Sequence, residues 1–203
     1  NLLAARQTSL SLNEKTYIER MRSAAGRMSL LISDLLDYAG ISGKRESNER
    51  VSLNRVVDQV LNTMDLAINE AGAQVHVGPL PEISGNASQL AQLFQNLIGN
   101  AIKFHRPSVP PVVHIAARTV PASTLPASAK PQIAAFYHRI DVEDNGIGFD
   151  EQYLDRIFQV FQRLHGRSEF SGTGIGLAIC EGVVTNHGGS ITASSEPGVG
   201  STF

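Results

Sequence analysis

The sequence predicts an α+β protein in which a two-layer α/β sandwich follows a helical hairpin. A heptad pattern of apolar residues fills residues 12–40, whereas helices and short strands follow one another without regular alternation after residue 50. Such irregular order favours segregated layers over a doubly wound sheet. A chain of 203 residues with 42% apolar residues is long enough for one domain and a smaller attachment. We therefore expect two domains, residues 1–45 and 46–203.

Residues 12–40 form the first predicted helix. Its apolar residues recur at alternating steps of three and four: Ile18, Met21, Ala25, Met28, Ile32, Leu35 and Ala39. This spacing is typical of a coiled-coil or four-helix-bundle seam, and the flanking Leu31, Leu36 and Tyr38 favour the bundle. Residues 1–9 are interpreted as the end of a preceding helix, so two copies of this hairpin would close a four-helix bundle. An amphipathic helix lying on its own domain is the alternative.

The glycine- and charge-rich stretch at 40–50 marks the expected domain boundary. The elements predicted beyond it are a helix at 53–70, a strand at 74–78, a helix at 87–104, strands at 112–118 and 133–144 joined by a proline-rich loop, a short helix at 151–158, a helix at 174–187 and strands from 190 onward.

Charge and cysteine content narrow the possible partners. A net charge of -2 and a pI near 6.3 provide no basic field for nucleic acid. No apolar run is long enough to span a membrane, so we expect no membrane contact by this portion. The single cysteine, Cys180, cannot form an intramolecular disulfide, which favours a reduced, cytoplasmic setting, and it is interpreted as a core residue.

The helix at 87–104 carries a polar edge beside its apolar face. Asn96, Asn100 and Lys103 fall within a narrow sector of the helical wheel. An amide oxygen can bind Mg²⁺ carried by a nucleotide, and an ammonium group adds positive charge next to the phosphates. The pattern suits a metal-phosphate site, although two capping asparagines and a solvated lysine would produce the same sequence.

Two glycine-containing motifs strengthen the first interpretation. "DNGIGF" places Asp144 at the end of a strand, where its carboxylate can accept a hydrogen bond from an exocyclic amine such as that of adenine. Taken alone, this motif is most often a plain turn. "GTGIGLAIC" runs through Gly172, Gly174 and Gly176 into a helix, whose N-terminal N–H groups favour an anion. It matches neither a dinucleotide fingerprint nor a P-loop.

Four motifs taken in order resemble the N, G1, F and G2 boxes of the sensor histidine kinases of two-component systems. They are "NLIGNAIKF", "DNGIGF", "IFQVFQRL" and "GTGIGLAI". The resemblance implies that residues 46–203 form a catalytic and ATP-binding domain of the fold shared with gyrase, Hsp90 and MutL. Residues 1–45 would be the later part of the dimerisation and histidine-phosphotransfer hairpin.

The resemblance also implies roles for single residues around a bound ATP. Asn100 would hold Mg²⁺, and Asn96 and Lys103 would contact phosphate. The residues implied at the adenine end are Asp144 for the amino group, Gly146 and Gly148 lining the pocket, and Phe104 near the ring.

The same resemblance implies a flexible lid between the G1 and G2 boxes. Phe158 and Phe161, with Ile157, would anchor it, and Arg163 would be its cation nearest the γ-phosphate. The residues implied at the hinge and the following helix are Gly172, Thr173, Gly174, Gly176 and Leu177. Asn96, Lys103 and Arg163 are then the expected catalytic residues.

The implied activity is phosphoryl transfer from ATP to a histidine and then to an aspartate of a response regulator. The implied partners are a second copy of the chain, the receiver domain of the regulator and an upstream sensor domain. An H box, a histidine followed by an acidic residue and a nearby proline, is absent around all six histidines: His76, His105, His114, His138, His165 and His187. We therefore expect the acceptor upstream of Asn1, ATP binding without autophosphorylation by this chain alone, and an incomplete G3 box at its end.

Three other functions fit part of the pattern. ATPases of the gyrase, Hsp90 and MutL type share the metal-binding asparagine, but they use a glutamate where this sequence has Asn96. An amide is no general base, which counts against hydrolysis. Anti-sigma-factor serine kinases also carry that glutamate. A non-catalytic dimerisation module switched by ATP is the remaining alternative.

Overall fold

The structure is a two-layer α/β sandwich with a long helix along the outer side of its helical layer. The computed structural model describes residues 12–41, 49–125, 134–164, 166, 170 and 172–203. The helices are α1 (Leu12–Ile41), α2 (Leu53–Thr63), α3 (Asp65–Ala71), α4 (Ala87–Lys103) and α5 (Gly176–Asn186), with short 3-10 helices η2 (Ala122–Thr124) and η3 (Glu151–Tyr153). The strands are β1 (Glu49–Ser52), β2 (Gln74–Val77), β3 (Glu82–Gly85), β4 (Val112–Pro121), β5 (Phe136–Asp144), β6 (Ser194–Glu196) and β7 (Gly200–Thr202).

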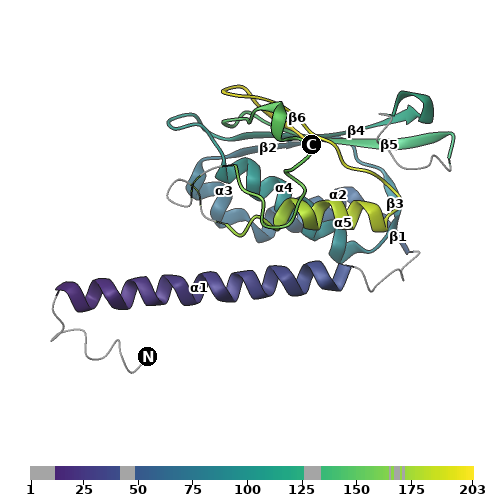
Figure 1. Ribbon diagram of the computed structural model, residues 1–203. Coiled ribbons are helices and arrows are strands. Elements are labelled where there is room, and N and C mark those ends of the chain that lie inside the picture. Colours follow the sequence, from purple (N-terminus) through teal and green to yellow (C-terminus); the bar gives the residue numbers. More distant parts are fainter. Residues whose placement is uncertain (1–11, 42–48, 126–133, 165, 167–169, 171) are drawn as a thin grey trace.

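Figure 1 shows the arrangement of these layers. The large sheet forms one layer, α2 to α5 cover one of its faces, and α1 runs beneath those helices and extends past them. The α+β sandwich predicted from the sequence is therefore confirmed.

The five-stranded sheet has the order β2-β4-β5-β7-β6. β2 pairs with β4 in parallel, and the other neighbours are antiparallel. The longest pairing joins β4 to β5, from Val113 opposite Asp144 to Pro121 opposite Phe136. Asp144 also pairs with Ser201 of β7. Asp144 therefore lies between β4 and β7. Because residues two positions apart in a strand point to the same face, its side chain lies on the same side of the sheet as the buried Val142, toward the helical layer.

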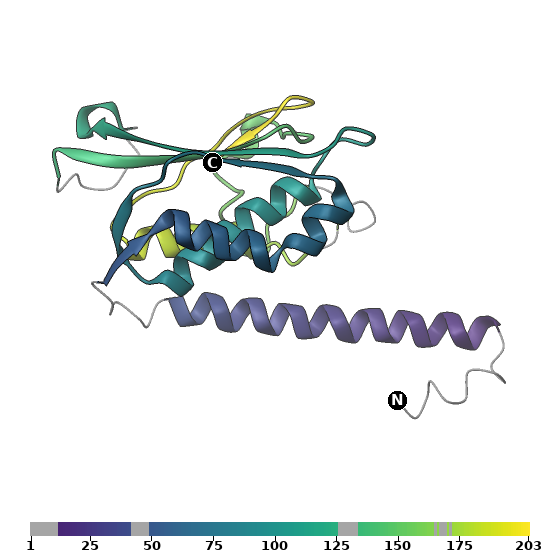
Figure 2. The same ribbon diagram turned by 180° about the vertical axis from the view of Figure 1, so that it is seen from behind.

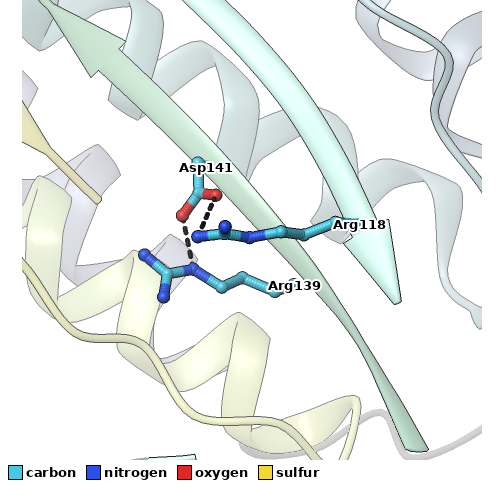
Figure 3. Close-up of polar contacts among 3 residues, drawn as sticks. All are labelled: Arg118, Arg139 and Asp141. Carbon is cyan, nitrogen blue, oxygen red and sulfur yellow. Dashed lines mark hydrogen bonds and ion pairs between the residues drawn. The ribbon is translucent and has the colours of Figure 1, made fainter. Parts of the chain in front are cut away.

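A three-residue ion-pair cluster lies on the other face of the β4–β5 pair (Figure 3). Arg118 and Arg139 are direct cross-strand neighbours, and Asp141 lies two residues along β5. The Asp141 carboxylate is 2.6 Å from Arg139 Nε and 3.4 Å from Arg118 Nη2. It offsets the repulsion between the two guanidinium groups. Because both arginines are more than half exposed, at 60% and 52%, the cluster contributes about 1 kcal/mol at most.

The core is built around α4. Asn86 caps this helix, because its side-chain oxygen accepts hydrogen bonds from the N–H groups of Ser88 and Gln89. The buried face of α4 packs against buried residues of α2, α5 and the sheet. The largest fully buried side chains of this core are Phe94 and Ile98 of α4 itself, Leu53 of α2, Ile115 of β4 and Ile175, which precedes α5. The predicted apolar face of this helix is confirmed, and it leaves the polar edge on the side of α5.

His187 locks the start of α4 to the end of α5. Its Nε2 accepts the Asn86 N–H at 3.0 Å, so the ring proton lies on Nδ1, which faces Val183 O at 2.8 Å. A side chain at Gly85 would overlap this ring, which explains the glycine at that position. These two contacts of His187 fix the relative position of α4 and α5, the two helices that carry the polar motifs.

Two predicted helices differ from the structure, and one small sheet was not predicted. The helix predicted at 53–70 is two helices, broken at Met64, where φ is -96° and ψ is 5°. The helix predicted at 151–158 is wrong beyond the single 3-10 turn of η3, because turns position Ile157 in the interior. The small antiparallel sheet of β1 and β3 was not predicted, since both strands are short and mostly exposed.

α1 confirms the predicted long helix. Much of its heptad seam is exposed, with Met21 at 63%, Met28 at 59%, Ile32 at 60% and Leu35 at 50%. Leu31, which flanks the seam, packs against the core. The expected preceding helix at 1–9 lies outside the described residues, so the hairpin and its four-helix bundle stay predictions. None of the described helices combines the length and apolar character needed to cross a membrane.

Candidate functional site

A cavity of about 340 Å³ lies between α4, the end of β5, the start of α5, β7 and α1, and residues 147–149, 157, 162–164, 170 and 172–174 also line it. This volume lies at the lower end of the range typical of small-molecule sites. Its lining includes most of the site residues that the sequence singled out. They are Asn96, Asn100, Lys103, Phe104, Asp144, Gly148, Arg163, Gly172, Thr173, Gly174, Gly176 and Leu177.

The polar edge of α4 forms one wall. The Asn96 amide donates to Gln92 O, and its oxygen faces the start of α5, where a Cβ at Gly176 would lie 2.9 Å from it. Within the described part of the chain, the Asn100 side chain makes no hydrogen bond, so its oxygen is available to the cavity. The described residues contain no group of three or more His, Cys, Asp or Glu suited to a metal. A metal here would therefore need ligand oxygens from the bound molecule.

Lys103 supplies a positive charge to this wall. Its ammonium nitrogen lies 4.1 Å from the centroid of the Phe104 ring, in cation–π range. Burial, and next the positive charge of Arg163, lower the pKa of Lys103. Both effects disfavour the charged form in the empty cavity. An anion bound beside Lys103 would reverse them.

Asp144 occupies the sheet side of the cavity. Its Oδ1 accepts the Gly146 N–H at 2.8 Å, while burial raises the pKa of its carboxyl group. The turn that follows packs tightly. A Cβ at Gly146 would lie 2.6 Å from Phe104 O, and Gly148, with φ of +63°, has no room for one beside Glu196 O. Gly146 itself lies behind the cavity wall, where it supports the turn.

Residues 157, 162–164, 170 and 172–174 line one side of the cavity. Ile157 is buried and lines the cavity, but Phe158 and Phe161 do not line it, and Phe161 is 59% exposed with φ of +66°. Phe170 contacts Phe104, with ring centroids 4.9 Å apart. The Arg163 guanidinium donates to Gly172 O at 2.6 Å and to Phe170 O at 2.5 Å. Arg163 thus lines the cavity, and its hydrogen bonds tie it to the backbone of residues 170 and 172 in its own segment.

The glycines before α5 allow this segment to approach closely. Gly174, with φ of +79°, faces Gln162 O, which would lie 2.7 Å from an added Cβ. Gly172, with φ of +135°, faces the Lys103 ammonium, which would lie 2.8 Å from one. A side chain at Gly174 would press on the backbone of residues 161–162, whereas one at Gly172 would displace the Lys103 ammonium. The structure thereby brings the phosphate-type motif at 172–176 against Asn96 and Lys103.

Several cavity residues were not predicted from the sequence. They are Leu30, Asp34, Ile147, Phe149, Gln162, Leu164, Phe170, Ser201 and Phe203. Ile147 and Phe149 lie within the quoted "DNGIGF" motif and could have been included. Gln162 and Leu164 likewise lie within the quoted "IFQVFQRL" motif. The others reach the cavity only through tertiary packing, and Leu30 and Asp34 come from α1, which the sequence assigned to another domain.

Comparisons with known proteins agree with this geometry. The profile of the family described as histidine kinase-, DNA gyrase B-, and HSP90-like ATPase matches residues 85–203. The chain is 37% identical over 194 residues to phytochrome-like protein Cph1 from Synechocystis, covering 96% of this chain and 24% of that protein. It is 30% identical over 206 residues to hybrid signal transduction histidine kinase L from Dictyostelium discoideum, covering 97% and 11%.

A solved structure shows the same fold. Full-length ShkA in complex with AMPPNP matches with a TM-score of 0.66 and 24% identity, over 97% of this chain and 39% of that one. The chain spans about a quarter of the length of Cph1.

Proposed function

This chain belongs to the histidine kinase-, DNA gyrase B- and HSP90-like ATPase family, and we propose that it binds Mg-ATP and presents the γ-phosphoryl group for transfer to a histidine. One observation carries the proposal. Three motifs separated by up to about 80 residues, at 96–104, 144–149 and 172–177, meet around a single cavity of about 340 Å³. Their chemistry matches the two ends of ATP.

The adenine would lie at the sheet end of the cavity. Asp144 is a hydrogen-bond acceptor there, held in place by the Gly146 N–H. An acceptor at this position favours the amino group of adenine over the carbonyl oxygen of guanine. Ile147, Phe149 and Phe104 supply apolar surface for the ring.

The triphosphate would lie between α4 and the start of α5. Lys103, Asn96 and the first N–H groups of α5 offer positive charge and donors to the phosphate oxygens. Asn100 would supply an oxygen to Mg²⁺, which bridges phosphate oxygens and neutralises their charge when bound. This arrangement orients the nucleotide, which is the main contribution of a protein to phosphoryl transfer.

Transfer fits the site better than hydrolysis. Hydrolysis needs a general base beside the attacking water, and Asn96, which lies on the cavity wall, cannot take up a proton at neutral pH. We therefore propose that the attacking group is an imidazole nitrogen, which bonds to the γ-phosphorus as the bond to the leaving oxygen of ADP breaks. The exposed heptad seam of α1 would hold two copies together, and a response regulator would accept the phosphoryl group.

ATP affinity measured with Mg²⁺ and with a chelator tests the binding step. We expect wild type to bind ATP more tightly with Mg²⁺, and Asn100→Ala to lose this gain while it keeps its affinity in chelator. Asn62→Asp, a surface change on α2, serves as a control that should behave as wild type. A wild-type chain that binds no ATP, or an Asn100→Ala variant with the full Mg²⁺ effect, would contradict the binding assignment.

Labelling of the intact protein with γ-labelled ATP tests the transfer step. A phosphohistidine is stable in alkali and labile in acid, so we expect label with this profile that moves to a response regulator. Release of inorganic phosphate without a labelled protein would favour the hydrolase. ATP binding with neither outcome would favour a non-catalytic switch.

A further inference from the structure

α1 forms part of the wall of the nucleotide cavity. Figures 1 and 2, which view the molecule from opposite sides, both place the residue-41 end of α1 beneath α5. Leu31 packs against the core of the sandwich, and Leu30 and Asp34 line the cavity. This contact uses a face of α1 other than the heptad seam, since Ile32 and Leu35 stay at least half exposed. The seam and the cavity contact can therefore exist together.

A hydrogen-bonded chain joins α1 to the start of α5. The Thr173 hydroxyl donates to Asp34 Oδ2 at 2.5 Å, across 139 residues of sequence. The same hydroxyl oxygen accepts the N–H of Ile175, the residue that caps α5, at 3.4 Å. The Asp34 carboxylate thus supplies negative charge at a helix N-terminus, where the partial charge of the helix is positive.

Asp34 meets the cavity at its cationic end. Gly172, next to Thr173, lies against the Lys103 ammonium, and Gly176 lies against the Asn96 amide. Among the described residues, no cation forms an ion pair with Asp34. Arg163, the other cation of the cavity wall, is hydrogen-bonded to backbone carbonyls of its own segment. The carboxylate is thus not neutralised within the part of the cavity where phosphate would bind.

We infer that Asp34 is a specificity-determining residue that competes with the terminal phosphate of the nucleotide for Thr173 and the N-terminus of α5. The inference rests on the proposed binding of ATP. A γ-phosphate at this end and the Asp34 carboxylate repel each other and use the same donors, so binding of one weakens the other. ADP lacks the γ-phosphate and disturbs the contact less. Because such coupling is reciprocal, ATP weakens the α1–α5 contact more than ADP does.

Asp34→Asn and Asp34→Ala test the inference through the affinities for ATP and ADP. Loss of a partly exposed charge-assisted contact should raise ATP affinity roughly fivefold, with less than about half of that gain for ADP. Asp37→Asn, an exposed change of equal charge one turn along the same helix, should change neither affinity. ATP affinity that is unchanged or lower in both Asp34 variants, or an equal gain for ATP and ADP, would overturn the inference.

Wild-type binding separates this inference from the proposed function. A wild-type chain that does not bind ATP refutes both. A wild-type chain that binds ATP, combined with Asp34 variants of unchanged affinity, refutes only the competition.

Amide hydrogen exchange provides a readout of the contact itself. Exchange over residues 28–38 should increase when wild type binds Mg-ATP and increase less with ADP. In Asp34→Ala it should already be raised without nucleotide, whereas Asp37→Asn should match wild type. Protection of residues 28–38 by Mg-ATP in wild type would contradict the inference, because it would mean that nucleotide strengthens the contact.

Discussion

Gly148→Ala is expected to destabilise the fold and weaken nucleotide binding through one close backbone contact. The backbone of Gly148 has φ of +63°, a conformation that costs an alanine about 1 to 2 kcal/mol. The added Cβ would also overlap Glu196 O, at the end of β6, and forcing backbone apart costs about 1 to 3 kcal/mol more. The expected loss in the free energy of unfolding is therefore roughly 2 to 5 kcal/mol.

Two glycines with similar backbone angles provide matched controls. Gly72, with φ of +61°, and Gly198, with φ of +79°, have no atom within 4 Å of an added Cβ. Gly72→Ala and Gly198→Ala should each reduce the free energy of unfolding only by the cost of the backbone angle, about 1 to 2 kcal/mol.

Denaturant unfolding measures the three losses, and ATP titration of the folded variants measures binding. Gly148→Ala should exceed both controls in the first assay. It should also weaken binding, because Gly148 lines the cavity. A Gly148→Ala variant no less stable than Gly72→Ala would refute the role assigned to the contact with Glu196.

Three further predictions concern the ionisable groups of the interior. Burial raises the pKa of Asp144, so its charge destabilises the fold above that pKa, and this cost disappears as pH falls below the pKa of the unfolded chain. Asp144→Asn should therefore keep or gain stability near neutral pH in denaturant unfolding, yet lose its preference for ATP over GTP in competition binding. Burial and Arg163 lower the pKa of Lys103, and a bound polyanion opposes this shift, so ATP binding at alkaline pH should take up protons. Calorimetry in buffers of different ionisation enthalpy should show this uptake in wild type and not in Lys103→Arg. Burial raises the pKa of Cys180 to about 12, so its thiol should react with a thiol reagent only as fast as the chain unfolds; rapid labelling of the native protein would contradict its buried position.

The sequence pattern itself indicates only what lies within one regular element. Asn96, Asn100 and Lys103 share one helix whose period gives them a common edge, and Asp144 ends a strand. The structure places all four on one cavity. Their roles, and the inclusion of Arg163 and residues 172–174, were expected from the family resemblance, because periodicity does not relate separate elements to one another.

The remaining parts depend on contacts between elements. The sequence predicts a short helix at 151–158, yet turns hold residues 154–158 and the stretch that follows, with Ile157 inside and Phe161 exposed. No local pattern distinguishes these two side chains, because the choice follows from what the segment meets across the cavity. Likewise, Asp34 looks like any charged residue on the outside of a heptad helix until α5 is placed beside it.

The two ends of the cavity hold partly buried ionisable groups of opposite kind. Burial shifts the pKa values of Asp144 and Lys103 in the directions that favour their neutral forms, so the charged forms carry a cost at each end. In the proposed complex, adenine would offer a hydrogen-bond donor to Asp144 and the triphosphate would offer negative charge to Lys103, so ATP would relieve both costs at once. A ligand that reaches only one end relieves only one of them. Asp34, which α1 brings to this cavity, would act only at the phosphate end, as a carboxylate that opposes the bound triphosphate.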